Sequence, residues 1–156
     1  GYNLVIVTLP APYASLSDRW GGSGRELEHP YVEEMKKNGA KILTTSLALS
    51  GANRSFRTQL GTYTMLEAIA ETLKLFGPGT KVCVEVVLMS VDAGLVEMGK
   101  KVLAIGGTRS GLDTAWAMIS ASTMNFFDLR ISELICKPKL TKDFLVSPAR
   151  QKITGF

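Results

Sequence analysis

The sequence predicts an α/β fold whose sheet is mainly parallel, with an antiparallel edge. Apolar runs of the kind found in strands, at 4–8, 41–45 and 102–105, are separated by segments with helical periodicity. Such alternation is typical of a parallel sheet with crossover helices. Two further apolar runs, 115–119 and 129–135, follow closely, and this spacing predicts the antiparallel edge. A chain of 156 residues is long enough for one domain with a real core.

Two helices are predicted from their start and stop signals. Pro30 suits a first helical turn, and Asn38-Gly39 is a typical stop, so we expect a helix between them. Thr64 is a typical N-cap, and the amphipathic segment that follows it should end at Gly77-Pro78-Gly79.

The run 81–96 fits two interpretations. Its many valines favour a strand, but it is longer than most strands. Glu85, Met89 and Asp92 lie at i, i+4 and i+7, on one face of a helix. We therefore interpret the run as a buried helix that stops at Gly94.

The charge is concentrated at the carboxyl end of the chain. The net charge is +4, and five basic residues with one acid follow position 136, so residues 1–136 are neutral. We divide the chain into a domain at 1–138 and a basic tail at 139–156. A neutral body disfavours a nucleic-acid interface on the domain, whereas the tail could contact RNA, an acidic protein or an anionic membrane. A solvated terminus is the simpler interpretation.

Composition also limits the compartment. No apolar run reaches the length of a membrane span, and no secretory signal is visible, although the chain starts at Gly1 and looks trimmed. Cys83 and Cys136 lack metal-ligand spacing, so we expect two reduced, buried thiols and no metal site. We expect an intracellular, cytoplasmic protein without membrane contact. The mitochondrial matrix is the alternative, since it suits a basic excess.

The glycine-rich segment from Gly106 to Thr114 is the first candidate site. Its glycines allow a ligand to approach the backbone closely, and successive amides can form an anion-binding nest. The side chains of Thr108, Arg109 and Ser110 are suited to phosphate. The segment fits neither the P-loop nor the dinucleotide fingerprint. The alternative is a tight turn between strands that binds no ligand.

Two further candidates lie elsewhere in the chain. The segment 49–54 follows a strand, where Ser50, Gly51 and Arg54 could face a ligand crevice. Alternatively it is only a helix start, with Asn53 and Ser55 as caps. Glu85 and Asp92 are acids on an apolar helix, so they need partners. They are either functional, as a base, a hydroxyl acceptor or a metal ligand, or structural, paired with Arg54, Arg57 or Arg130 or with a backbone amide.

Several short motifs occur in an order that resembles one protein family. The motifs are Leu49-Ser50-Gly51, Ala70-Glu71-Thr72-Leu73, Lys81-Val82-Cys83-Val84-Glu85, Met89, Asp92-Ala93-Gly94-Leu95, Ala104-Ile105-Gly106-Gly107-Thr108, Gly111 with Asp113-Thr114-Ala115, and Phe127-Asp128-Leu129-Arg130-Ile131. The chain resembles, over residues 40–138, the stand-alone pyruvate kinase C-terminal domain-like proteins of archaea and bacteria.

The resemblance implies a three-layer α/β/α fold with a crevice above the strand ends. In some members this crevice holds flavin mononucleotide (FMN), and in pyruvate kinase the related domain binds a phosphorylated effector. The resemblance also implies that the family's opening strand–loop–helix unit is missing here. The residues that would line or support the crevice are Thr8, Ser50, Gly51, Arg54, Glu85, Asp92, Gly106, Gly107, Thr108, Ser110, Gly111, Asp113 and Thr114.

The loops of this chain differ from the family at several places. Leu47 occupies a position where the family has histidine, and 59–62 replaces a basic-aromatic-Gly-Gly stretch. We therefore keep two hypotheses. The first is binding of a phosphate-bearing small ligand, FMN above others, with no assignable reaction. The alternative is a ligand-free structural or interaction subunit, with a protein partner or a second copy, in a larger assembly that is possibly organellar and contains RNA.

Overall fold

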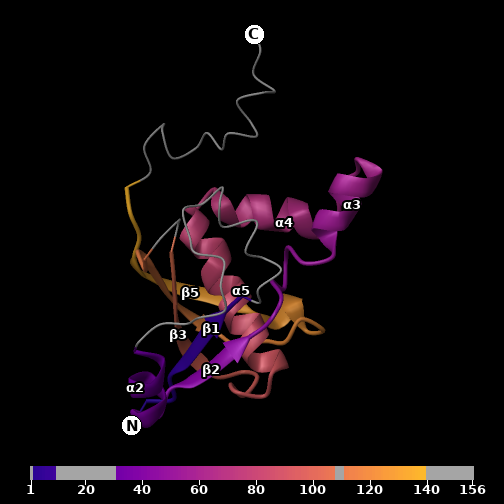
Figure 1. The fold of residues 1–156 in the computed structure, drawn as a ribbon. Coiled ribbons are helices and arrows are strands. Elements are labelled where there is room, and N and C mark those ends of the chain that lie inside the picture. Colours follow the sequence, from indigo (N-terminus) through magenta and orange to yellow (C-terminus); the bar gives the residue numbers. More distant parts are fainter. Residues whose placement is uncertain (1, 10–30, 108–110, 140–156) are drawn as a thin grey trace.

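The computed structural model describes residues 2–9, 31–107 and 111–139. Figure 1 shows the arrangement of its helices and strands. The elements in chain order are β1 (Val5–Thr8), α2 (Val32–Lys37), β2 (Lys41–Thr44), α3 (Asn53–Leu60), α4 (Met65–Lys74), α5 (Pro78–Asp92), β3 (Lys101–Gly106), β4 (Thr114–Ile119), the 3₁₀ turn η2 (Phe126–Asp128) and β5 (Arg130–Cys136).

Helix α5 is the centre of the core, as the buried-helix interpretation predicted. Ten of its 15 residues are buried, and it contacts α4, β1, β3 and β4. Pro78 occupies its first turn, and Gly94 follows its end with a φ of 69°, a left-handed conformation that glycine adopts without strain. The valines that resembled a strand pattern are tolerated because tertiary burial outweighs their weak preference for β structure.

The described strands form two sheets. Strands β1 and β2 pair in parallel, with Val5 opposite Lys41, while β3, β4 and β5 form an antiparallel sheet in that order. The mixed α/β class and the antiparallel edge are therefore confirmed. The expected mainly parallel sheet is not what these strands show, because two of their three pairings are antiparallel. The connection 107–113 is too short for the crossover of about a dozen residues that a parallel pair needs.

The predicted helices at α2 and α4 are confirmed, and Asn38 is the C-cap of α2 as expected. The N-cap of α2 is Tyr31, so Pro30 does not occupy its first turn. Thr64 caps α4 through a reciprocal capping box with Glu67, and α4 ends at Lys74, before the expected glycines. The expected caps of α3 are wrong. Ala52 occupies the N-cap position, and the Asn53 side chain instead donates to the Leu49 carbonyl oxygen at 3.0 Å. No residue of α3 is buried, and Figure 1 shows this helix projecting from the body beyond α4.

The core lies between α5, α4 and the inner face of the antiparallel sheet. Its buried members are Leu49, Ala70, Cys83, Val84, Val87, Leu88, Ala104 and Met118. Cys83 is buried as expected, but the expectation for Cys136 is wrong, since this residue is exposed. The reason is that Cys136 ends β5, an edge strand whose residues are all exposed.

Some predictions fall outside the described residues. These concern Pro30, the residues 108–110 of the glycine-rich segment, and the tail from 140 onward. Among the described helices, none combines the length and the apolar character needed to cross a bilayer.

Candidate functional site

Ser50, Lys81 and Glu85 form a buried polar cluster between α5 and the turn that follows β2. The Lys81 ammonium donates to Ser50 Oγ at 2.7 Å and forms an ion pair with the Glu85 carboxylate. Glu85 Oε1 also accepts the backbone N–H of Leu49 at 3.0 Å and the Ser50 hydroxyl at 3.3 Å. The side chain of Lys81 is 10% exposed and that of Glu85 only 1%, so the pair is held away from solvent.

The local structure explains why these groups meet. Lys81 and Glu85 are four residues apart on α5, a spacing that places them on the same helix face. Leu49 is buried in the core, which holds the turn 47–51 against that face. Ser50 is therefore positioned by apolar packing on one side and by charge on the other.

The electrostatic balance of the cluster depends on burial. Burial lowers the pKa of Lys81 from its usual 10.5, and the charge and hydrogen bond of Glu85 offset part of this effect. The structural interpretation of Glu85 is supported in part, because it accepts a backbone amide as expected. Its cationic partner, however, is Lys81 and none of the arginines considered. Arg57 contacts Glu67 at 3.4 Å, and Arg130 donates to the carbonyl oxygens of Phe127 and Leu129.

The turn that carries Ser50 leads into the amino end of α3. The first turn of α3 places the backbone amides of Ala52 and Asn53 beside Ser50 and Gly51. Within the described part of the chain neither amide makes a hydrogen bond. Arg54 lies in the same helical turn, and α3 has no acid in its first turn. Amides at a helix start, together with a hydroxyl and cations, are groups that bind anions.

The described part of the glycine-rich turn packs tightly on its own chain. It joins β3 to β4, two antiparallel strands, so it does not lie at the mouth of a parallel sheet as we had expected. A Cβ on Gly107 would lie 1.8 Å from the Gly111 carbonyl oxygen, and one on Gly79 would lie 2.2 Å from Thr114 Oγ1. The Asp113 amide donates to the Gly106 carbonyl at 3.0 Å. Packing within the chain therefore explains why glycine is needed at these positions, without a ligand. Phosphate binding by the turn stays a prediction.

The predicted site residues do not form one group. Gly79 contacts Thr114, whereas Lys81 contacts Ser50, and residues two apart on a helix point about 200° from each other. The turn and the cluster therefore lie against opposite faces of α5. Asp92 shares a helix face with Glu85, but it lies about 10 Å further along the axis, at 1.5 Å per residue, and accepts the Thr123 amide at 2.9 Å.

Thr8 ends β1 opposite Thr44, and the structure gives it no contact with the cluster. Lys81 was not among the predicted site residues. Its position four residues before Glu85 was the signal that could have found it, since a buried acid on a helix requires a partner.

A separate apolar groove of about 400 Å³ lies between α4, α5, η2 and β5. Its lining residues are Ala68, Ile69, Thr72, Leu73, Val84, Phe126, Phe127, Leu129 and Ile131. The rings of Phe126 and Phe127 meet edge to face, with centroids 5.4 Å apart. The lining carries no charged side chain, which distinguishes this groove from the Ser50 cluster.

No protein-family model matches this sequence. The resemblance to the pyruvate kinase C-terminal domain-like proteins therefore stays a prediction. Among the residues that the structure describes, no three histidine, cysteine, aspartate or glutamate side chains gather as a metal ion would require.

Proposed function

We propose that the chain binds a phosphate-bearing small molecule, with the phosphate beside Ser50 at the amino end of α3. The observation that carries the proposal is the fixed position of Ser50, 2.7 Å from the buried Lys81 ammonium and next to two amides of the α3 start. We assign Ser50, Gly51, Arg54 and Lys81 to this site. Glu85 orients Lys81 and Ser50 and does not touch the phosphate.

Physical chemistry favours an anion over a reaction at this place. The ammonium of Lys81 already shares its protons with Glu85 and Ser50, so it is poorly suited to remove a proton from the serine. A lysine has three N–H donors, so one remains after the bonds to Ser50 and Glu85. The α3 amides add neutral donors, and the Ser50 O–H can join them by exchanging its 3.3 Å bond to Glu85 for a bond to the phosphate. These donors suit phosphate without a large excess of positive charge.

FMN is the ligand that the resemblance implies, and its phosphate fits this donor set. The described residues around Ser50 define no slot for the flavin ring. We therefore propose binding of the phosphate group, and FMN is the first ligand to be tested.

Titrations of the purified protein with three probes test the proposal. FMN and inorganic phosphate should both bind, and riboflavin, which has the ring but lacks the phosphate, should bind at least about 10-fold more weakly than FMN. Flavin fluorescence measures the two flavins, and ³¹P NMR line broadening measures phosphate. Equal binding of riboflavin and FMN would place the contact at the ring and contradict the proposal.

Two variants locate the phosphate. Ser50→Ala and Arg54→Gln should each weaken phosphate and FMN binding by about 10-fold, the effect of one hydrogen bond to a charged group. Lys100→Gln is the control, because Lys100 is an exposed cation paired with Glu97 at 3.2 Å. If the control weakened binding as much as the other two, general charge attraction and not this site would explain the affinity.

A structural or interaction role is the second candidate, and the apolar groove with its exposed aromatic ring favours it. Its test is the native mass of the protein isolated from its own cells. A mass well above that of the chain supports a place in an assembly, and a monomer contradicts it.

A further inference from the structure

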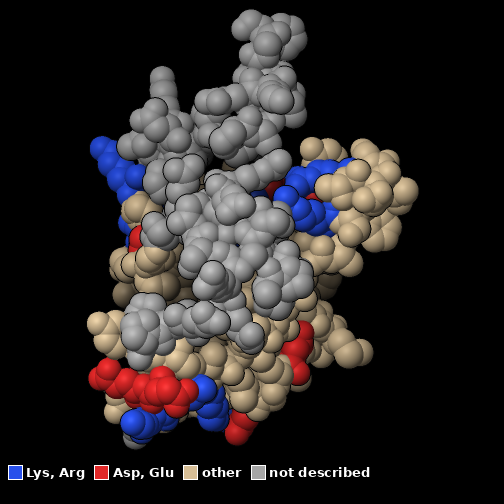
Figure 2. All heavy atoms as spheres, viewed as in Figure 1, with Lys and Arg blue, Asp and Glu red and all other residues tan. Residues whose placement is uncertain are grey.

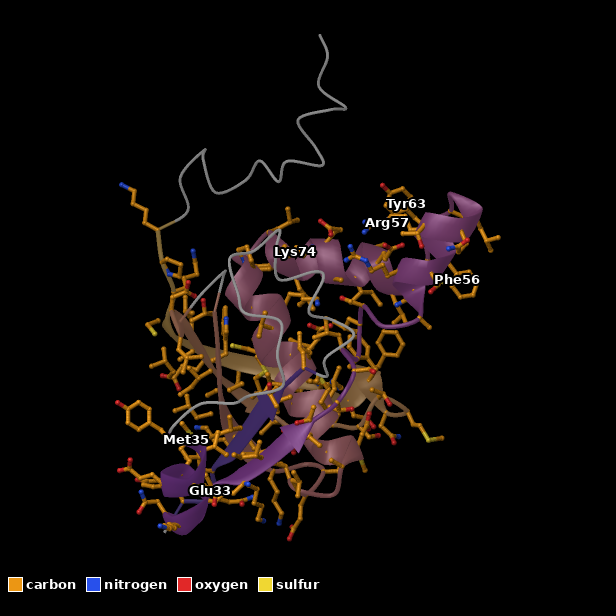
Figure 3. The ribbon with its side chains drawn as sticks, viewed as in Figure 1. Glu33, Met35, Phe56, Arg57, Tyr63 and Lys74 are labelled. Carbon is orange, nitrogen blue, oxygen red and sulfur yellow. The ribbon has the colours of Figure 1, made fainter. Side chains whose placement is uncertain are left out.

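Helix α3 exposes an apolar face that nothing in the described structure covers. Phe56 and Leu60 are four residues apart and share one face of the helix, where they are 46% and 68% exposed. Tyr63, in the link to α4, and Met65, the first residue of α4, are exposed as well. Figure 3 shows Phe56 and Tyr63 at the projecting end of the molecule. An amphipathic helix gains most of its stability from packing its apolar face, so α3 lacks the contact that its sequence supports.

The same chain carries a surface of complementary character. Phe127 lines the groove between α4 and η2, yet its side chain is 81% exposed. Ile69 and Leu73 form the opposite wall on α4. A groove of about 400 Å³ has room for side chains of the size of Phe56 and Leu60.

Helix α3 cannot enter the groove of its own chain. Only residues 61–64 separate α3 from α4, and both ends of this link are fixed. Gly61 ends α3 in the left-handed conformation, with a φ of 64°, and Thr64 begins α4 in a complete capping box. These caps direct α3 beyond the end of α4 (Figure 1), whereas the groove is lined by residues along the side of α4, such as Ile69 and Leu73.

We propose that α3 of one copy docks into the groove of a second copy, and that the contact is reciprocal. Each chain carries both the apolar face of α3, with Phe56 and Leu60, and the groove. A dimer with a two-fold axis therefore contains two identical contacts, each with α3 of one copy in the groove of the other. Charge does not oppose this pairing. Helix α3 carries no acid, Arg57 is paired with Glu67, and the uncharged groove is bordered by one acid and one base, Asp128 and Arg130. Figure 2 shows blue side chains beside the projecting end, and others at the left and at the bottom of the view.

A second copy would be the partner in the structural or interaction role described above, and dimerisation does not depend on the phosphate site. Sedimentation of the purified protein over a range of concentrations tests it. The wild type should reach twice the mass of the chain. Leu60→Lys and Phe127→Lys should each weaken dimerisation by about 30-fold or more, as expected for the loss of a central apolar anchor. Both positions are exposed, so circular dichroism should show both variants folded.

A mixture of the two variants gives the decisive result. In an equimolar mixture the intact α3 of the Phe127→Lys chain can enter the intact groove of the Leu60→Lys chain. Native mass spectrometry with one isotope-labelled variant should therefore show heterodimers at well over twice the amount of either homodimer, which is the ratio that random association gives. The two mutated surfaces both carry lysine, so they repel each other and cannot create a new ion pair. Leu112→Lys, at another exposed leucine outside both surfaces, should leave the dimer intact.

Three outcomes would overturn the inference. The first is a wild type that stays monomeric at the highest concentration, and the second is a dimer that resists both lysine variants. The third is a mixture with no preference for heterodimers. A purified monomer combined with a large native mass in cells would reject the second copy while leaving an interaction with another protein in place.

Discussion

The buried pair Lys81–Glu85 gives the sharpest test of the structure. Glu85→Gln leaves a buried ammonium without its anion, and Lys81→Met leaves a buried carboxylate without its cation. Removal of one partner of a buried pair costs about 3–5 kcal/mol. We expect Lys81→Met to lie near the upper end, because Glu85 is only 1% exposed. Glu85→Gln should cost less, since glutamine still accepts the Leu49 amide and Lys81 can lose its proton.

The double variant Lys81→Met/Glu85→Gln should be more stable than either single variant. Methionine fills a similar volume, and glutamine retains the acceptor for Leu49, so no buried charge remains. We expect a total loss of about 1 kcal/mol, the net value of one hydrogen bond. Urea unfolding followed by circular dichroism measures all three variants. The coupling energy of the cycle should exceed about 2 kcal/mol, beyond the usual range of independent sites.

The pH dependence of the Glu85→Gln variant provides an independent check. Burial holds the pKa of Lys81 below its usual 10.5, and loss of Glu85 removes the group that opposes this effect. The unfolded chain then binds more protons than the folded chain between the lowered pKa and 10.5, so stability rises with pH through that window. The cost of the substitution should therefore shrink between about pH 7 and about pH 10.

The exposed pair Lys36–Glu33 on α2, joined at 3.0 Å, is the matched control. Lys36→Met and Glu33→Gln should each change stability by less than about 0.5 kcal/mol, as is usual for surface ion pairs. The buried ion pair would be contradicted if neither buried single variant lowered the free energy of unfolding by more than these controls do. It would also be contradicted if the decrease in the double variant equalled the sum of the two single decreases.

Four further predictions concern the two thiols, a helix cap and a tightly packed glycine. An aromatic disulfide reagent near pH 8 should modify only the exposed Cys136 in the folded protein and both thiols after denaturation, because burial raises the pKa of Cys83 to about 12. Because the pKa of Cys83 is raised in the folded protein, keeping this thiol protonated stabilises the fold. The contribution is complete below 9.0, the pKa of the thiol in the unfolded chain, and is lost as the pH rises toward 12. The difference in free energy of unfolding between the wild type and Cys83→Ala should therefore be smaller at about pH 11 than at neutral pH. Thr64→Ala should cost about 1 kcal/mol in urea unfolding through loss of the capping box, and an unchanged midpoint would contradict the cap. Gly79→Ala should lower the melting temperature, because a methyl group there would lie 2.2 Å from Thr114 Oγ1, and an unchanged melting temperature would contradict the packing of Gly79 against the glycine-rich turn.

Much of the fold was predictable because its signals are local. The apolar runs at 41–45 and 115–119 became strands, and Thr64 became the cap of α4. Helix α5 was predictable from spacing despite its valines. The candidate site was predictable only in part, since Ser50 and Glu85 were identified but Lys81 was not. The caps of α3 were predicted wrongly because side chains such as Asn53 can bond to several backbone groups, and the path of the preceding turn selects among them.

The sequence by itself determined where most of the helices and strands lie, because caps, glycines and apolar periodicity act over a few residues. The tertiary structure decided which of these elements meet. It brought Ser50 to Lys81 across 31 positions of the chain, placed the glycine-rich turn on the other side of α5, and left Cys136 and the apolar face of α3 uncovered. These outcomes depend on the direction of each connection and on which face finds a partner. The burial of a residue depends on how all the helices and strands pack together, so a local sequence pattern does not predict it.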